Sequence, residues 1–125
     1  VVAVPILGNV AAGEPLFAEE NHDGSVAVPQ EYVKSSAHHF ALNVKGDSMR
    51  DAGIIDGDVA VFAQQQTARN GDIVVAMVEE AYTLKRFFKE KNRVRLFSDD
   101  TATTEIYTQN VRILGRLVHL VRNYA

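Results

Sequence analysis

The sequence predicts a mainly β domain, a barrel or a sandwich with little helix. Its apolar residues fall into short runs rich in Val, Ile, Phe and Tyr, and Gly, Asp and Asn separate these runs. Polar and apolar residues alternate most clearly in VRLF (residues 94–97) and in VRILGRLVHLVR (residues 111–122), as in a half-buried strand. With 125 residues, 46% of them hydrophobic, the chain can bury one core, so we expect a single domain.

The expected strands follow one another along the chain at residues 3–10, 40–45, 58–63, 72–78, 81–88, 93–97 and 111–122. The Asn-Gly pair of ARNGD (residues 68–72) predicts a tight turn at the start of the fourth strand. VEEAYT (residues 78–83) predicts the hairpin connection between the fourth strand and the fifth.

Helix is expected only as two short turns, PQEYV (residues 29–33) and SMRDAG (residues 48–53), and Ser48 could cap the start of the second. Residues 11–25 are mostly small or acidic and include Pro15, which blocks regular strand pairing. We expect an exposed loop there, of the kind that can move.

Composition excludes several classes of site. A net charge of -3 and a pI near 5.8 argue against a broad nucleic-acid surface. The absence of cysteine excludes disulfides, thiolate metal ligands and cysteine nucleophiles. No apolar run approaches the roughly 18 to 20 residues of a membrane span, and no basic-then-apolar leader begins the chain, so we expect a cytoplasmic protein without membrane contact.

Two groups of residues have both a functional and a simpler interpretation. The four histidines, His22, His38, His39 and His119, have no carboxylate at a ligand-like spacing. We therefore expect structural or surface histidines, and neither a metal nor a cofactor. The stretch KRFFKEKNRVR (residues 85–95) mixes cations with aromatic residues as nucleic-acid surfaces do, but a solvated hairpin is the simpler interpretation.

Ser48 lies in GDSMRDAGIIDGD (residues 46–58), and a serine hydroxyl becomes a nucleophile only when a base takes its proton. None of the histidines has a triad-like context, whereas a lysine can serve if burial lowers its pKa from about 10.4 toward 7 or 8. Lys85, in the strand-like run AYTLKRFF, is the candidate base. Alternation puts Lys85 and Arg86 on opposite faces, and periodicity leaves open which of them points inward.

Three segments together resemble the C-terminal domain of LexA-type repressors, the self-cleaving Ser/Lys peptidases of the bacterial DNA-damage response. VPILGNVAAGEP (residues 4–15) is similar to the cleavage-site region, VKGDSMRDAGIIDGD (residues 44–58) to the nucleophile segment, and ARNGDIVVAMVEEAYTLKRFF (residues 68–88) to the segment with the general base. The order of the segments and the interval from Ser48 to Lys85 (85 - 48 = 37) are also similar to those of the family.

The resemblance extends to ILGRLVHLVRNY (residues 113–124), which is similar to the family's closing strand, so it covers nearly the whole chain. Residues 98–110 depart from the family pattern, because they lack its proline-containing turn and Pro-Ile pair. The resemblance implies a compact, strongly bent, barrel-like β-sheet. Residues 1–25 would hold the first strand and the cleavage loop, and residues 26–125 the catalytic core.

The site residues implied by the resemblance are Ser48 as nucleophile, Lys85 as general base, Ala12-Gly13 as the scissile bond, the backbone N–H groups of Asp47 and Ser48 as the oxyanion hole, and Leu7, Val10 and Glu14 as anchors of the substrate loop. Small residues at Ala12 and Gly13 would let an extended backbone approach the nucleophile closely.

The resemblance also implies partners. The RecA filament on single-stranded DNA would activate cleavage, and operator DNA would be bound only through an N-terminal domain absent from this chain. The closing strand would form a homodimer by edge pairing, although an internal strand is the alternative. Two other functions remain open: a UmuD-like mutagenesis protein or phage repressor domain, and a catalytically silent dimerisation module. A leader peptidase uses a similar dyad, but would need a membrane anchor.

Overall fold

The computed structural model describes residues 1–8, 21–33, 37–78, 81–98, 106–109 and 111–124. Within these residues the chain forms nine strands, two 3-10 helices and no α-helix, which confirms the predicted mainly β domain. The strands are β1 (Val2–Leu7), β2 (His22–Val28), β3 (His39–Asn43), β4 (Val59–Gln64), β5 (Ile73–Val78), β6 (Ala81–Lys89), β7 (Val94–Phe97), β8 (Ile106–Thr108) and β9 (Val111–Val121), and the 3-10 helices are η2 (Gln30–Tyr32) and η3 (Arg50–Ala52).

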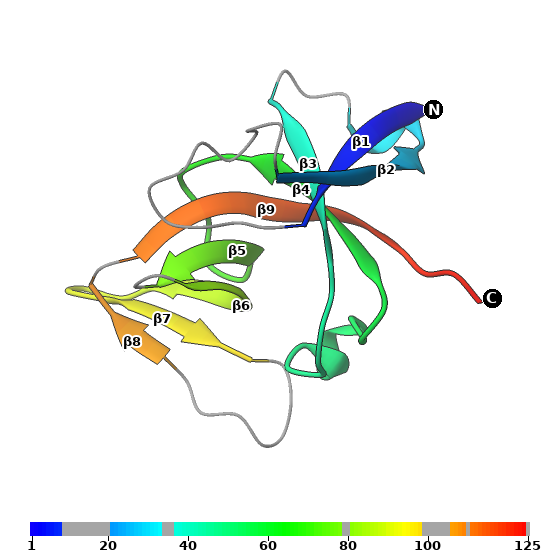
Figure 1. Ribbon diagram of the computed structural model, residues 1–125. Helices are drawn as coiled ribbons and strands as arrows, with labels where there is room; N and C mark the ends of the chain where they lie inside the picture. The colour runs from blue at the N-terminus through cyan, green and yellow to red at the C-terminus, as the bar shows by residue number, and fades with distance from the viewer. Residues whose placement is uncertain (9–20, 34–36, 79–80, 99–105, 110, 125) are drawn as a thin grey trace.

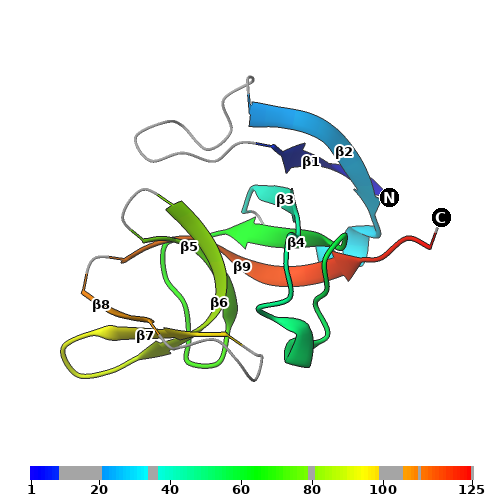
Figure 2. The same cartoon turned by 60° about the horizontal axis from the view of Figure 1, so that its bottom comes forward.

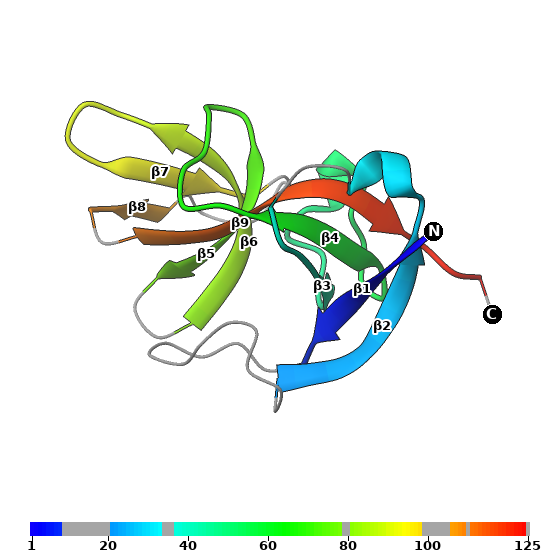
Figure 3. The same ribbon diagram turned by 90° about the horizontal axis from the view of Figure 1, so that it is seen from above.

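All nine described strands belong to one mixed sheet, in the order β2-β1-β3-β4-β9-β5-β6-β7-β8. Adjacent strands are antiparallel except β1 and β3, which are parallel. The long strand β9 runs across the middle, between β1–β4 on one side and β5–β8 on the other, and the sheet bends strongly there (Figures 1 and 3). The sheet is open, because its outer strands β2 and β8 do not pair with each other.

The core lies on both faces of the sheet, which explains why β4 is a continuous apolar run rather than an alternating one. The central cluster, on one face, consists of Leu7, Phe40, Leu42, Ala60, Phe62, Val75 and Leu114. Beside it, β9 passes so close to β3 and β4 that a Cβ at Gly115 would lie 3.0 Å from the Ala63 carbonyl oxygen and from the Phe40 ring. Only glycine allows this close approach.

The seven predicted strands are all present, with small shifts at their ends. The first ends at Leu7, and residues 9 and 10 of its predicted range lie outside the described part of the chain. Two further strands were not predicted. β2 overlaps the end of the segment that we expected to be a loop, so that expectation is wrong for residues 22–25; residues 9–20 lie outside the described part of the chain. β2 is an outer strand and most of its residues are exposed, so its sequence does not alternate between polar and apolar residues. The pattern that predicts a strand is therefore missing. β8 has only three residues.

The predicted turns and hairpins are confirmed. In the Asn-Gly turn, the Asp72 N–H donates to the Arg69 carbonyl at 3.0 Å, and Gly71 takes the left-handed φ of 94°. β5 and β6 form a hairpin with Val78 opposite Ala81. The KRFFKEKNRVR stretch forms the β6–β7 hairpin, with an exposed tip, as its simpler interpretation predicted.

Candidate active site

Ser48 is carried by a closed loop, residues 44–58, which we call the Ser48 loop. It leaves β3 and returns as β4, projecting beyond the ends of both strands (Figure 2). Two hydrogen bonds close its base: the Val44 N–H donates to the Asp58 carbonyl at 2.8 Å, and the Gly57 N–H donates to the Val44 carbonyl at 2.9 Å. Across the loop, the Gly46 N–H donates to the Asp56 carboxylate at 2.7 Å.

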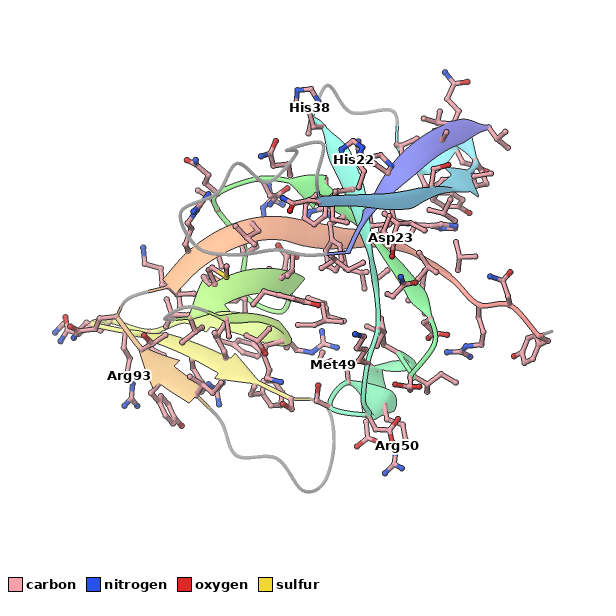
Figure 4. All side chains as sticks on the ribbon, viewed as in Figure 1. His22, Asp23, His38, Met49, Arg50 and Arg93 are labelled. Atoms are coloured by element: carbon pink, nitrogen blue, oxygen red, sulfur yellow. The ribbon has the colours of Figure 1, made fainter. Side chains whose placement is uncertain are left out.

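Within this loop, Ser48 occupies the second position of a turn in which the Arg50 N–H donates to the Asp47 carbonyl at 3.1 Å. The prediction that Ser48 caps a helical turn is wrong: the cap position of η3 is Met49, and no side chain donates or accepts a capping bond there. Met49 is only 2% exposed and points toward the sheet, whereas Arg50 points away from it (Figure 4). Burial of Met49 therefore fixes the rotation of the turn.

Beside Ser48 is a cavity of about 230 Å³. One wall comes from the Ser48 loop and from the central cluster, which contributes Leu42, Ala60 and Phe62. The opposite wall is β6, through Tyr82, Thr83 and Leu84. The cavity thus brings together Ser48 and the segment that leads directly to Lys85. Its lining mixes apolar side chains, among them Met49, with polar ones such as Asn43 and Lys45.

The structure answers which of the two neighbouring cations points inward. Lys85 is buried, with 8% of its surface exposed, and lies opposite Val74 in the β5–β6 pairing. Arg86 points to the other face, where its Nη1 donates to the Gly71 carbonyl at 2.7 Å. Lys85 is therefore the buried cation, as a lysine base requires.

The first strand leads into the predicted cleavage segment. Leu7, a predicted loop anchor, is a core residue that packs in the central cluster beside the cavity walls. The Gly8 N–H donates to the Asn21 carbonyl at 2.7 Å, so residues 9–20 begin and end at neighbouring points. The predicted site residues Val10, Ala12, Gly13 and Glu14 lie outside the described residues.

A buried ion pair that the sequence did not indicate supports the Ser48 loop. Asp58 is 1% exposed, and Arg122, just beyond β9, donates to both of its carboxylate oxygens, from Nε at 2.7 Å and from Nη2 at 2.8 Å. The hydrogen bond from Arg122 is the main reason that the pKa of Asp58 lies below its ordinary value, and the same pairing raises the pKa of Arg122. No local pattern connects two residues 64 positions apart.

The histidines lie away from this site. His22 and His38 are exposed, and His119 stacks on Tyr32 with ring centroids 4.3 Å apart. Burial lowers the pKa of His39. Among the described residues, no group of three or more His, Asp or Glu side chains could hold a metal ion. In the same part of the chain, no helix has the length and apolar character that crossing a membrane requires.

Comparison with known proteins decides the family. The family model described as Peptidase S24-like matches residues 5–118. The chain belongs to the Peptidase S24-like family. This S24-like chain is also 46% identical to the LexA repressor of Desulforamulus reducens over 122 residues, which are 98% of this chain and 56% of that protein.

Two further relatives agree. The LexA repressor of Clostridium kluyveri is 44% identical over 124 residues, or 99% of this chain and 61% of that protein. The LexA repressor of Desulfitobacterium hafniense is 48% identical over 121 residues, or 97% and 59% of the two chains. The S24-like chain thus spans somewhat under two thirds of the length of these curated relatives. The resemblance to the C-terminal domain of LexA-type repressors is confirmed.

Proposed function

We propose that this S24-like domain cleaves its own chain at Ala12-Gly13, with Ser48 as the nucleophile and Lys85 as the general base. One observation carries the proposal: Ser48 borders a cavity whose opposite wall is formed by the three residues before the buried Lys85. A serine beside a cavity and a buried lysine in a strand that lines the same cavity are the components that a Ser/Lys peptidase requires.

The burial of Lys85 supports its role as a base. A lysine base has to accept a proton, and such bases are found where the side chain is removed from bulk water. Lys85 is 8% exposed. Val74 lies opposite Lys85 on β5, and Phe87, two residues farther along β6, is buried on the same side of the strand. Both of these neighbours of Lys85 are apolar and buried.

The proposed reaction proceeds in three steps. The neutral Lys85 amine takes the Ser48 hydroxyl proton as Oγ attacks the Ala12 carbonyl carbon, and the oxyanion accepts hydrogen bonds from backbone N–H groups, for which Asp47 and Ser48 are candidates. The C–N bond to Gly13 then breaks, and the Lys85 ammonium returns its proton to the departing amine. Water afterwards hydrolyses the ester on Ser48 and leaves a carboxylate on Ala12.

The tether of the substrate supports an intramolecular reaction. Residues 9–20 start beside Leu7, which packs against the same cluster that walls the cavity, and end at Asn21, which is bonded to Gly8. Ala12 is five residues beyond Leu7, and an extended chain of that length spans roughly 17 Å. Such a tether supplies a high effective concentration, so an undocked resting state of the segment would restrain cleavage.

The biological role follows from the relatives. They are named LexA repressors, and we propose that this domain belongs to an SOS transcriptional repressor that cleavage inactivates. The proposed activator is the RecA filament on single-stranded DNA, which would have to prefer the docked form of the cleavage segment over the undocked form. Operator DNA would be bound through an N-terminal domain.

The partial pairing of β9 supports a homodimer. Residues 111–116 pair with β5 and residues 115–121 pair with β4, so within the described residues nothing pairs with 117–121 on the β5 side. An open strand edge of this length can pair with the same edge of a second copy. β9 therefore has a partner strand on both sides only at Gly115 and Arg116, and residues 117–121 are the candidate dimer strand.

Incubation of the purified chain at alkaline pH without a partner tests the proposal, with the products weighed by mass spectrometry. We expect scission between Ala12 and Gly13 that is faster at higher pH and absent in Ser48→Ala and Lys85→Ala. An intact wild-type chain, also after addition of a RecA filament on single-stranded DNA, would favour the silent dimerisation module. Analytical ultracentrifugation of the same sample tests the dimer separately.

A further inference from the structure

We infer that Arg122 is a positioning residue for the Ser48 loop: it fixes the turn that orients Ser48, although it lies at the end of β9. The inference rests on the proposed self-cleavage, which it extends by a residue that contacts neither Ser48 nor the cavity. It is argued from three hydrogen bonds of Arg122, and from the backbone bonds that connect them to Met49.

Arg122 holds both ends of the segment 53–58. Its Nη2 donates to the Gly53 carbonyl at 2.8 Å, where the chain leaves η3 with the left-handed φ of 84°. Its Nε and Nη2 also donate to the two oxygens of the Asp58 carboxylate, where the chain enters β4. A guanidinium has donors in a fixed planar fork, so it can hold the two points at a set separation, which a lysine ammonium cannot.

Backbone hydrogen bonds connect the contacts of Arg122 to the turn that carries Ser48. Asp58 also accepts the Ile55 N–H at 2.9 Å, which fixes the middle of the segment. Next to it, the Ile54 N–H donates to the Met49 carbonyl at 3.2 Å, and that carbonyl also accepts the Ala52 N–H at 3.1 Å. Met49 follows Ser48 directly. Met49 is thus two hydrogen bonds from the Arg122 guanidinium by way of Gly53 and Ile54, and three by way of Asp58 and Ile55.

Three residues along the connection from Arg122 to Met49 are buried, which makes the hydrogen bonds between them hard to break. Ile54 and Met49 are each 2% exposed, and Asp58 is 1% exposed, so water cannot easily replace the bonds between them. Arg122 itself is reachable, since 34% of its side-chain surface is exposed. A small guanidinium compound could therefore enter the space left when this side chain is shortened.

The test compares Arg122→Ala and Arg122→Lys with Arg112→Ala, an exposed arginine at the other end of β9, in the alkaline self-cleavage assay. The temperature is chosen so that circular dichroism shows every variant folded. We expect Arg122→Ala to cleave roughly ten- to a hundredfold more slowly than the wild type, because a small misplacement of a nucleophile slows a reaction by about this factor. Compared with Arg122→Ala, Arg122→Lys should recover more of the wild-type thermal stability than of the wild-type cleavage rate. Added guanidinium ion should accelerate cleavage only in Arg122→Ala.

Hydrogen–deuterium exchange of the peptides that cover residues 44–58 provides a readout independent of cleavage. We expect faster exchange in Arg122→Ala than in Arg112→Ala. If folded Arg122→Ala cleaves at the wild-type rate, or if exchange in residues 44–58 does not change, the inference is wrong and Arg122 only stabilises the fold. A wild-type chain that does not cleave would instead contradict the proposed function, and exchange alone would then decide whether Arg122 fixes the loop.

Discussion

Arg122 and Asp58 form a two-bond ion pair, at 2.7 and 2.8 Å, in which the Asp58 side chain is almost completely buried and the Arg122 side chain is about one third exposed. Breaking such a pair by removing one partner leaves the other charge buried without compensation. The pair connects the end of the chain with the Ser48 loop, so its loss should affect both stability and the loop.

Arg122→Ala should lower the free energy of unfolding near pH 7, because it leaves the buried Asp58 carboxylate without its guanidinium partner. Urea unfolding followed by circular dichroism measures this. Arg112→Ala is the matched control. An equal loss of unfolding free energy in both variants would show that the ion pair with Asp58 adds no stability.

The same pair predicts a dependence of stability on pH. In the folded chain the pKa of Asp58 is held below its ordinary value of 3.8, first by the hydrogen bond from Arg122. A carboxylate with a lowered pKa stabilises the fold above the unfolded-state value, and this contribution is lost as the pH falls through the folded-state value. The difference in unfolding free energy between wild type and Asp58→Asn should therefore shrink from about pH 4 downward. A difference that stays constant from pH 7 to pH 3 would contradict the lowered pKa.

Lys85→Met should abolish self-cleavage without unfolding the chain. Methionine has a similar length to the lysine stem and needs no solvation when buried, so we expect the chain to remain folded. The neighbouring Arg86→Met is the control: it loses the bond to the Gly71 carbonyl but should still cleave. Mass spectrometry measures cleavage, and thermal unfolding measures stability, in both variants. The effect of removing the proposed base can then be compared with the effect of removing its neighbour. Cleavage by Lys85→Met would contradict the assignment of the base.

Gly115→Ala should destabilise the domain by about 1–3 kcal/mol, because the new Cβ meets the Ala63 backbone oxygen and the buried Phe40 ring, neither of which can move easily. Gly8→Ala is a useful comparison, since its Cβ meets only the exposed Asp23 side chain. Urea unfolding should show the larger loss for Gly115→Ala. The reverse order would mean that β9 and β4 can separate without cost.

The stacking of Tyr32 on His119 should contribute about 0.5–1.5 kcal/mol and is the ring contact that attaches η2 to β9. A double-mutant cycle with Tyr32→Leu and His119→Leu measures the coupling by urea unfolding. Additive losses would show that the two rings do not stabilise each other.

The sequence predicted the elements that bury a face or form a known turn, and missed those that do neither. β4, β5 and β9 are apolar runs with buried faces, and the Asn-Gly turn has a local signature. β2 has little burial of its own, so only pairing with β1 makes it a strand. The capping prediction for Ser48 failed because local propensity favoured a cap, whereas the buried Met49 set the start of η3.

The candidate site was predictable only in part. The choice between Lys85 and Arg86 needed the sheet, because pairing with β5 and the bond to Gly71 decide which face each cation takes. The Asp58–Arg122 pair needed the whole fold, since it joins the start of β4 to the residue after β9. The roles assigned to Ala12, Gly13, Val10 and Glu14 remain predictions.

The position of β1 has a consequence for what a cut chain would do. β1 lies between β2 and β3 in the sheet, with Val4 and Leu7 buried, and it precedes the proposed scissile bond. Hydrolysis at Ala12-Gly13 would break a covalent link but would leave this strand held by its backbone ladder with β2 and by its buried side chains. A nicked chain would therefore stay assembled until β1 separates from the sheet, and the lifetime of the nicked form, rather than the cut alone, would set when the two fragments part.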